Sequence, residues 1–274
     1  LMDYNIELIS VLGDDEYGKQ IQKLLKNKQI ESKLFIDPHR KTTQKHRTFF
    51  SNSFDGKPSP TSSPPTTSLI TQFTPNHLVN RLDIEDVVSI NSNLETEIFE
   101  YIKKKTDLDA IILSDYNKGV LTLSLCRNII QYCNEKSILT FVDPKLDDVS
   151  KYQNCFCFKP NMLEAKQITD ANKTGEIFKS LYETIFPKNI IITDSNKGVY
   201  VNDSQNIISG KNDVNVVDVT GAGDVFIAVL VSCFLQNRNI LSSSKIAQFI
   251  ASKSVEYIGN YDFQQRHLNE YELL

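Results

Sequence analysis

The sequence predicts an α/β fold in which helices cover a mostly parallel sheet. Short apolar runs of strand length alternate with helix-length amphipathic stretches over most of the chain, as in parallel strands joined by helical crossovers. Near the C-terminus, the β-branched run 216–219 leads into Gly221 and Gly223, and the apolar run 225–230 follows without a proline. This second pattern predicts a strand, a tight glycine turn and a buried helix.

The N-terminal part begins with an apolar strand over 6–12 and a following helix. Between them, the stretch 13–19 has the G-x-x-x-x-G-K spacing of a phosphate-binding loop, but Gln20 replaces the Ser or Thr that would bind Mg²⁺. Three consecutive acidic residues would also line the phosphate cradle. We therefore interpret the stretch as a helix N-terminus that is capped by Asp14 or Asp15.

Two β-like stretches, 33–36 and 45–50, flank a cationic polar segment. Lys45 and Arg47 alternate with other residues in the second stretch. Such cations either contact a phosphorylated substrate or protect the edge of a small sheet from pairing with other chains. The sequence alone leaves both interpretations open.

The composition changes to Ser, Pro and Thr over 51–75, and four prolines lie close together there. This segment has too little apolar surface to fold, so we expect a disordered insertion. Strand-like patterning resumes over 78–83. The insertion therefore interrupts one small β unit with strands at about 33–50 and 76–83, within a single domain that spans 1–274.

The pattern after residue 83 is regular. Helical periodicity and short apolar runs alternate, which favours right-handed crossovers between parallel strands. The expected elements are, in order, a helix over 95–105, a strand over 110–114, a helix over 123–135, strands over 139–142 and 155–158, helices over 163–169 and 175–186, a strand over 189–193, a hairpin near 198–201, the strand before Gly221 and two C-terminal helices.

Polar clusters directly follow three of these apolar runs, at 114–119, 143–145 and 159–164. Each cluster taken alone is also typical of helix capping or turns. Because ligands bind beyond the carboxyl ends of parallel strands, the three clusters and the Gly221 turn are expected to line one rim. Together they predict an active-site cleft.

The Gly221 turn has a specific chemical use. The first backbone N–H groups of a helix lack intrahelical acceptors, and the helix dipole adds positive charge there, so phosphate binds well. Asp224, in the same turn, would repel a phosphate unless it acts as a general base that accepts the proton of an attacking hydroxyl. The alternative is a packing turn in which Asp224 caps the helix.

Composition and charge exclude several classes of function. The net charge of −4 provides no general attraction to nucleic acid or to an anionic membrane, and no uncharged run approaches the ~20 residues needed to span a bilayer. Five cysteines, an odd number, do not make a disulfide framework. We expect a cytoplasmic protein whose partners are small molecules.

The string Asp-Val-Thr-Gly-Ala-Gly-Asp at 218–224 resembles the signature of the ribokinase-like (PfkB) carbohydrate kinases. The resemblance implies a three-layer α/β/α fold with a small β lid, with Asp224 as the catalytic base and the amides of Gly221, Ala222 and Gly223 as an anion hole. Other strings resemble the kinase domain of bacterial D-glycero-β-D-manno-heptose 7-phosphate kinases, which phosphorylate the C1 hydroxyl of the sugar with ATP. These strings are 40–47, 76–83, 114–119 and 142–145.

The same resemblance implies the ligand contacts. Asn161 and Glu164 match the family's Asn-x-x-Glu motif, which organises Mg²⁺ and phosphate, with Glu164 acting through water. Besides these two, the residues implied for ATP are Thr193, Gly198, Asp218 and Thr220, and those for the sugar phosphate are Lys45, Arg47, Asp115, Lys118, Asp143 and Lys145. Exposed lid edges favour a homodimer formed through the lid.

Two departures from the family pattern leave alternatives open. Asp194 and Ser195 stand where the family's nucleotide segment has a polar or basic residue and a glycine. The family's strand ending in Gly-Asp and its Gly-Gly helix start, which together hold the sugar, have no counterpart before Val11. We expect a Mg²⁺-dependent ATP:sugar kinase that a partner chain completes; the alternatives are a truncated, non-catalytic nucleotide-binding or interaction module and a kinase for another sugar.

Overall fold

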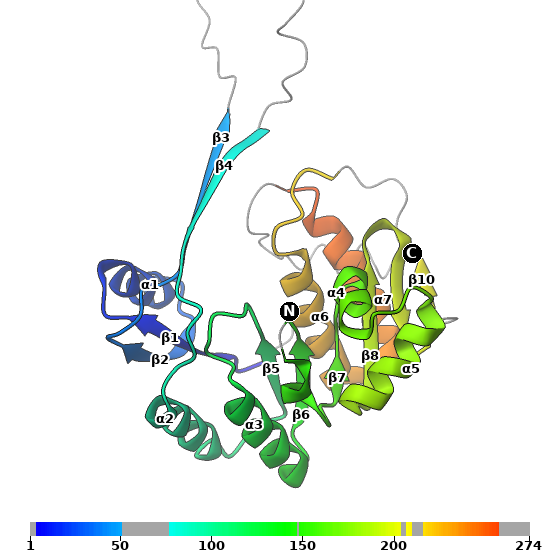
Figure 1. Cartoon of the computed structure of the whole chain (residues 1–274), viewed down its shortest axis with the longest axis horizontal. Coiled ribbons are helices and arrows are strands. Elements are labelled where there is room, and N and C mark those ends of the chain that lie inside the picture. The colour runs from blue at the N-terminus through cyan, green and yellow to red at the C-terminus, as the bar shows by residue number, and fades with distance from the viewer. Residues whose placement is uncertain (1–3, 51–76, 147, 204–206, 210–215, 258–274) are drawn as a thin grey trace, which may run out of the picture. The chain divides into compact units, whose positions relative to one another are not determined.

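The computed structural model describes residues 4–50, 77–146, 148–203, 207–209 and 216–257. The chain divides into two compact units, a smaller one over Leu8–Asp86 and a larger one made of Leu1–Glu7 and Val87–Leu274 (Figure 1). The insertion expected over 51–75 lies outside the described residues. The single domain over 1–274 stays a prediction.

Among the described residues, the smaller unit contains one helix and two two-stranded sheets. Strands β1 (Glu7–Gly13) and β2 (Glu31–Asp37) form one sheet, with helix α1 (Glu16–Asn27) between them in the chain. Strands β3 (Gln44–Phe50) and β4 (His77–Ile84) form the other sheet and run antiparallel. The prediction that the strands on either side of the insertion belong together is therefore confirmed.

The first turn of α1 confirms the capping interpretation of the stretch 13–19. Asp15 is the N-cap, and its Oδ1 accepts a hydrogen bond from the Gly18 amide at 2.8 Å. Its Oδ2 accepts from the Thr42 amide at 2.8 Å. The Thr42 and Gly18 amides hold the pKa of Asp15 below its usual value, although partial burial opposes them. The helix N-terminus is thus occupied by the chain's own carboxylate.

The larger unit is a three-layer α/β/α structure. Its elements are, in chain order, α2 (Ser92–Lys103), β5 (Ala110–Ser114), α3 (Leu123–Lys136), β6 (Leu139–Asp143), the 3-10 helix η1 (Val149–Tyr152), β7 (Cys157–Phe158), α4 (Met162–Thr169), α5 (Thr174–Ile185), β8 (Asn189–Asp194), the 3-10 helix η2 (Ser195–Lys197), β9 (Gly198–Val201), β10 (Ile207–Ser209), α6 (Ala222–Asn237) and α7 (Ile240–Ser254).

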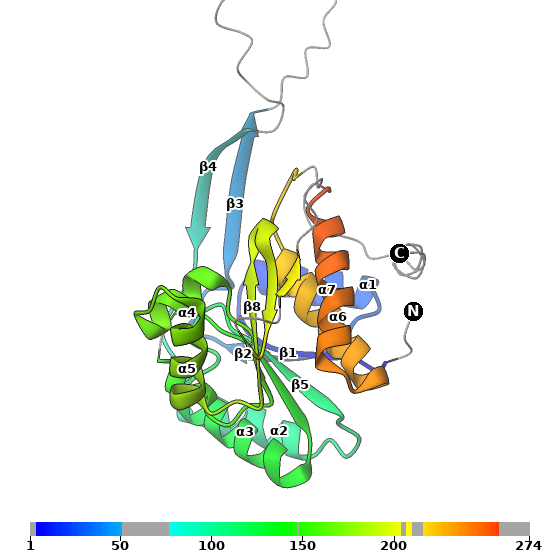
Figure 2. The ribbon, with the colours of Figure 1, turned by 90° about the vertical axis from the view of Figure 1, so that its right-hand side faces the viewer.

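The sheet has the order β10-β9-β8-β7-β6-β5, parallel from β5 to β8 and antiparallel from β8 to β10. Helices α3, α4 and α5 lie on one face of the sheet, and α6 and α7 lie on the other (Figure 2).

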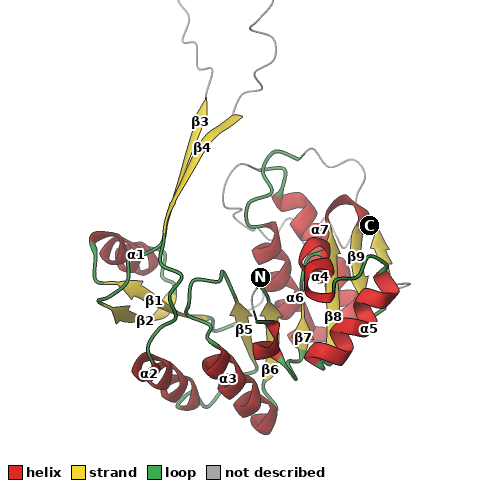
Figure 3. Ribbon diagram, viewed as in Figure 1, coloured by secondary structure: helices red, strands yellow, loops and turns green. Residues whose placement is uncertain are grey.

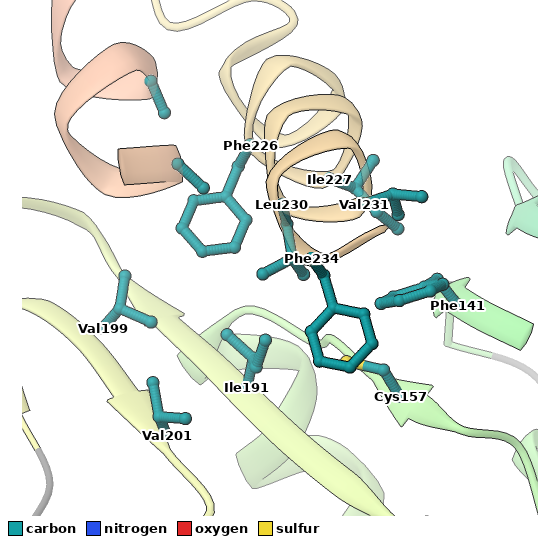
Figure 4. Packing of buried hydrophobic residues seen from close by; sticks show 12 residues of the cluster. Phe141, Cys157, Ile191, Val199, Val201, Phe226, Ile227, Leu230, Val231 and Phe234 are labelled. Atoms are coloured by element: carbon teal, nitrogen blue, oxygen red, sulfur yellow. The ribbon is translucent and has the colours of Figure 1, made fainter. Parts of the chain in front are cut away.

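The core between the sheet and α6 fixes the start of α6. Phe226, Leu230 and Phe234 of the helix pack toward Phe141 and Ile191 of the strands, and all five side chains are buried (Figure 4). The Phe141 and Phe234 rings meet edge to face with centroids 5.9 Å apart. Full burial of such side chains stabilises the fold by about 1.5–3 kcal/mol each. The glycine turn is therefore attached to a helix that is packed into the buried core of the unit.

The prediction of a strand immediately before the glycine turn is wrong. The described residues 216–219 form a loop (Figure 3). The amides of Val217 and Asp218 both donate to the carbonyl oxygen of Val255, at the end of α7, and so are not used by a neighbouring strand. Val216 and Val219 are exposed. β-branched residues favour strands only where a half-buried sheet surface accepts them, and this segment has none. The predicted turn and buried helix are confirmed.

Candidate active site

Backbone hydrogen bonds align the residues that follow the parallel strands. The Asp115 amide, just past β5, donates to the Asp143 carbonyl oxygen at the end of β6 at 3.0 Å. The Lys159 amide, just past β7, donates to the Val142 carbonyl oxygen at 2.9 Å. The expectation that these strand ends share one rim is confirmed.

The glycine turn leaves the start of α6 open to an anion. Gly221 is the N-cap residue, with φ of 79°, and no side chain caps the helix at this position. Asp218 shapes the turn, because its Oδ1 accepts the Thr220 amide at 2.9 Å. The amides of Gly223 and Asp224 in the first turn therefore have no intrahelical acceptors, and they combine with the helix dipole to favour negative charge.

A buried ion pair lies beside this turn. Lys159 Nζ is 2.9 Å from Asp143 Oδ1, and the two side chains are 3% and 17% exposed. A Cβ at Gly223 would lie 3.9 Å from both Lys159 Nζ and Asp143 Oδ2. Burial raises the pKa of Asp143 above its ordinary value, although Lys159 acts in the opposite direction. Lys159 thus brings a positive charge close to the open helix end.

A second cation on the rim is Lys145, whose Nζ is 2.7 Å from Glu164 Oε1. The Glu164 Oε2 accepts the Asn161 amide at 2.9 Å, and Asn161 Oδ1 accepts the Glu164 amide at 2.8 Å, which makes a capping box for α4. Burial acts to lower the pKa of Lys145, but the hydrogen bond to Glu164 and the charges of Asp143 and Asp224 outweigh it and raise the pKa. Lys145 therefore stays charged at neutral pH.

Asp224 is exposed and contacts Tyr116, a residue in the loop after β5. The Tyr116 hydroxyl donates a hydrogen bond to Asp224 Oδ1 at 2.6 Å. Burial, this bond and the charges of Asp224 and Asp143 raise the pKa of Tyr116 well above its usual value. Tyr116 was not among the predicted site residues, although its place directly after the β5 strand end was a usable signal.

The carboxylate of Asp115 was expected to contact the sugar. In the described structure it contacts three other residues of the protein. Lys151 Nζ is 2.7 Å from Asp115 Oδ2, and the Tyr152 hydroxyl also donates to Oδ2. The Asn117 amide donates to Oδ1 at 2.7 Å. Lys151 also donates to the Leu121 carbonyl oxygen at 3.0 Å. This buried Asp115 cluster fixes the loop after β5, and a sugar contact for Asp115 stays a prediction.

The other predicted residues of the larger unit lie near the same strand ends. Thr193, at the end of β8, forms a parallel bridge with Asn161. Gly198 starts β9 with φ of 110°, which suits glycine. The Ala222 amide donates to the Val219 carbonyl oxygen at 3.3 Å, so it has an acceptor within the turn. Lys118 lies in the loop after β5, next to Gly119.

Lys45 and Arg47 lie in the smaller unit, on β3. Their partners in the antiparallel register on β4 are Asp83 and Arg81. Lys45 is exposed. Their predicted contact with the substrate stays a prediction.

Across the described ranges, no group of three or more His, Cys, Asp or Glu side chains could hold a metal ion. Within the same residues, no helix is long and apolar enough to cross a membrane. The free cysteines are all buried where described, and burial raises the pKa values of Cys126 and Cys157 to about 12. None of these groups adds a second reactive centre to the rim.

Comparisons with known proteins agree with this geometry. Residues 62–266 match the model of a family described as pfkB family carbohydrate kinase. A bifunctional protein HldE of Aliarcobacter butzleri is 31% identical over 274 residues, which cover 97% of this chain and 52% of that protein. A bifunctional protein HldE of Campylobacter jejuni is 33% identical over 258 residues, with 92% and 49% covered. The chain spans about half the length of the curated relatives it matches.

Solved structures share the fold at lower identity. Phosphofructokinase-2 from Escherichia coli in complex with potassium matches with a TM-score of 0.72 at 13% identity, over 98% of this chain and 82% of that one. Ribokinase from Giardia lamblia matches with a TM-score of 0.69 at 15% identity, over 97% and 82%. The predicted ribokinase-like α/β fold is confirmed.

Proposed function

Because the chain belongs to the pfkB family of carbohydrate kinases, we propose that it transfers the γ-phosphoryl group of ATP to a sugar hydroxyl, namely the C1 hydroxyl of a heptose 7-phosphate. The observation that carries the proposal is the position of Asp224, whose carboxylate lies in the uncapped first turn of α6. The same turn lies beside the buried pair of Lys159 and Asp143. A base and an anion site thus occupy one helix end.

In this reaction Asp224 is the general base. Its carboxylate accepts the proton of the sugar hydroxyl while the hydroxyl oxygen forms a bond to the γ-phosphorus. The bond from that phosphorus to the bridging oxygen of ADP breaks, and ADP leaves with the electron pair. General base catalysis of this kind contributes typically 10²- to 10⁴-fold to the rate.

The open end of α6 and the lysines beside it stabilise the transferred group. The amides of Gly223 and Asp224 donate toward the negative charge that develops on the phosphoryl oxygens. Lys145 and Lys159 add positive charge at the same rim. Preorganised donors of this kind act without reorganisation during the reaction, which makes electrostatic stabilisation a large contribution to catalysis.

The residues at the rim fit a magnesium ion held through water. Glu164 has both oxygens engaged, by Lys145 and by the Asn161 amide, and Mg²⁺ usually keeps several waters and takes few protein ligands. Asn161 and Glu164 would hold the hydrated ion next to the phosphates. When bound, Mg²⁺ neutralises charge on the β- and γ-phosphates.

The assignment of heptose 7-phosphate is supported by the strings 40–47, 114–119 and 142–145 and by the relatives named HldE, at 31% and 33% identity. Asp143, Lys145 and Lys118 are the proposed sugar-phosphate contacts in the larger unit, and Lys45 and Arg47 those in the smaller one. Thr193, Gly198, Asp218 and Thr220 are proposed for the nucleotide. A cytoplasmic location and a homodimer through the lid also remain proposals.

The proposal is tested with a panel of heptose, hexose and pentose sugars and their phosphates in the presence of Mg-ATP. ADP release is measured for each sugar, and ³¹P NMR of the product reports the phosphorylated carbon. The expected result is release that requires one sugar, with heptose 7-phosphate the fastest and phosphate on its anomeric carbon. Release with a different sugar would replace the substrate assignment, and no release from the folded protein would overturn the kinase function.

A further inference from the structure

The two carboxylate oxygens of Asp224 have different surroundings. Tyr116 donates to Oδ1 at 2.6 Å. Oδ2 faces the glycine turn, 3.9 Å from the place that a Cβ at Gly221 would take. Within the described residues, no donor to Oδ2 is present at hydrogen-bond distance. One oxygen is therefore held by the protein, and the other faces the open end of α6.

The backbone that carries Tyr116 is held on both sides. Asp115 precedes it and is fixed by Lys151, Tyr152 and the Asn117 amide. Gly119 follows it with φ of 75°, and its carbonyl oxygen accepts the Ile90 amide at 2.9 Å. A Cβ at Gly119 would overlap the Val88 carbonyl oxygen. The hydroxyl of Tyr116 is thus aimed by a buried and tightly packed support.

Tyr116 remains a donor throughout the neutral range. Its pKa is raised, by burial and then by Asp224 and Asp143, so the phenol stays protonated. The other ionisable groups that face this end of α6 are Asp143 and Lys145 from the end of β6 and Lys159 from the end of β7. None of these three donates to Asp224 at hydrogen-bond distance in the described structure. Tyr116 is therefore the group that orients the carboxylate.

We propose that Tyr116 is a positioning residue for the base: its hydroxyl holds Oδ1 of Asp224, so that Oδ2 is the oxygen that accepts the proton of the sugar hydroxyl. This inference rests on the proposed role of Asp224. The buried Asp115 cluster has a role in this proposal, because Asp115, Lys151 and Tyr152 fix the loop that positions the Tyr116 hydroxyl.

The contact itself is tested without any enzyme assay. With tyrosine labelled at the ring carbon that bears the hydroxyl, ¹³C NMR at neutral pH observes Tyr116, whose signal is assigned by its absence in Tyr116→Phe. In Asp224→Asn the hydroxyl loses its charged acceptor, so the Tyr116 signal should shift. An unchanged Tyr116 signal would overturn the contact and the proposal with it.

The consequence for catalysis is tested by comparing Tyr116→Phe with Tyr182→Phe. Tyr182 is half-buried on α5, and its hydroxyl is 3.4 Å from the Asn202 carbonyl oxygen, so it is a matched loss of one hydroxyl elsewhere. Tyr116→Phe should lower kcat about tenfold with the KM for ATP unchanged, because the base loses a charge-assisted hydrogen bond.

The control should keep the wild-type kcat and the wild-type KM for ATP. Equal kcat for Tyr116→Phe and the wild type would overturn the positioning role and leave the kinase function intact. A wild type that phosphorylates no sugar would instead overturn the proposed function, and the positioning role would fall with it. The two failures are therefore distinguishable.

Discussion

Replacing Lys151 by methionine should lower the free energy of unfolding by about 3 kcal/mol. The Lys151 and Asp115 side chains are each 4% exposed, and Nζ lies 2.7 Å from Oδ2. Removing one partner of a buried pair typically costs 3–5 kcal/mol, because the remaining charge stays buried. The lower end applies here because the Tyr152 hydroxyl and the Asn117 amide still donate to Asp115. Methionine keeps the apolar part of the lysine stem.

The measurement is urea unfolding of the wild type and the variant, followed by circular dichroism. The matched control is Lys173→Met, which removes a lysine from the pair with Glu176, where the side chains are 82% and 58% exposed. That change should leave the free energy of unfolding nearly unchanged, since exposed pairs contribute little. If Lys151→Met costs less than about 1 kcal/mol, the view that this pair supports the loop after β5 is refuted.

Three further predictions follow from the same contacts. Gly119→Ala should lower the melting temperature and destabilise the fold by about 2 kcal/mol or more, because φ is 75° and the new Cβ would overlap the Val88 carbonyl oxygen; an unchanged melting temperature would contradict this. Gly223→Ala should keep or slightly raise stability but slow phosphoryl transfer at least about tenfold, since its methyl group would occupy the anion approach, 3.9 Å from Lys159 Nζ; wild-type turnover would count against the anion site. Burial raises the folded-state pKa of Asp143 above its ordinary value of 3.8, so its contribution to stability is fully present below that value and is lost as the pH rises through the folded-state pKa. The difference in unfolding free energy between the wild type and Asp143→Asn should therefore fall as the pH rises above 3.8, and a difference that grows would contradict the assignment.

The buried strands of the sheet could be predicted because they consist of short runs of apolar residues. The run 190–192 is apolar at every position, as expected for a strand covered on both faces, and it forms the buried part of β8. The run 216–219 is similarly β-branched but forms a loop, because its amides bond to the Val255 carbonyl oxygen after α7. These hydrogen bonds join the run to the end of a helix that follows much later in the chain, and the local pattern does not show them.

The candidate site was predictable as a rim, but its pairings were not. The rule that strand ends meet at one edge placed Asp143, Lys145 and Glu164 together correctly. Tyr116 and Asp224 are 108 positions apart, and no spacing rule says that their side chains meet. The partners of Asp115 come from η1, a short 3-10 helix that the sequence did not indicate. Side-chain pairing depends on packing between distant segments, which a single sequence does not reveal.

The most direct test of the central claim is a single-turnover comparison of the wild type with Asp224→Asn at saturating ATP and sugar phosphate. Quenched samples report phosphoryl transfer, and calorimetry reports the Kd for ATP. The account predicts that transfer slows by about 10²- to 10⁴-fold while the Kd stays within about threefold, because the base acts on the sugar hydroxyl rather than on ATP binding. Equal rates of transfer in the two proteins would contradict the assignment of Asp224 as the base.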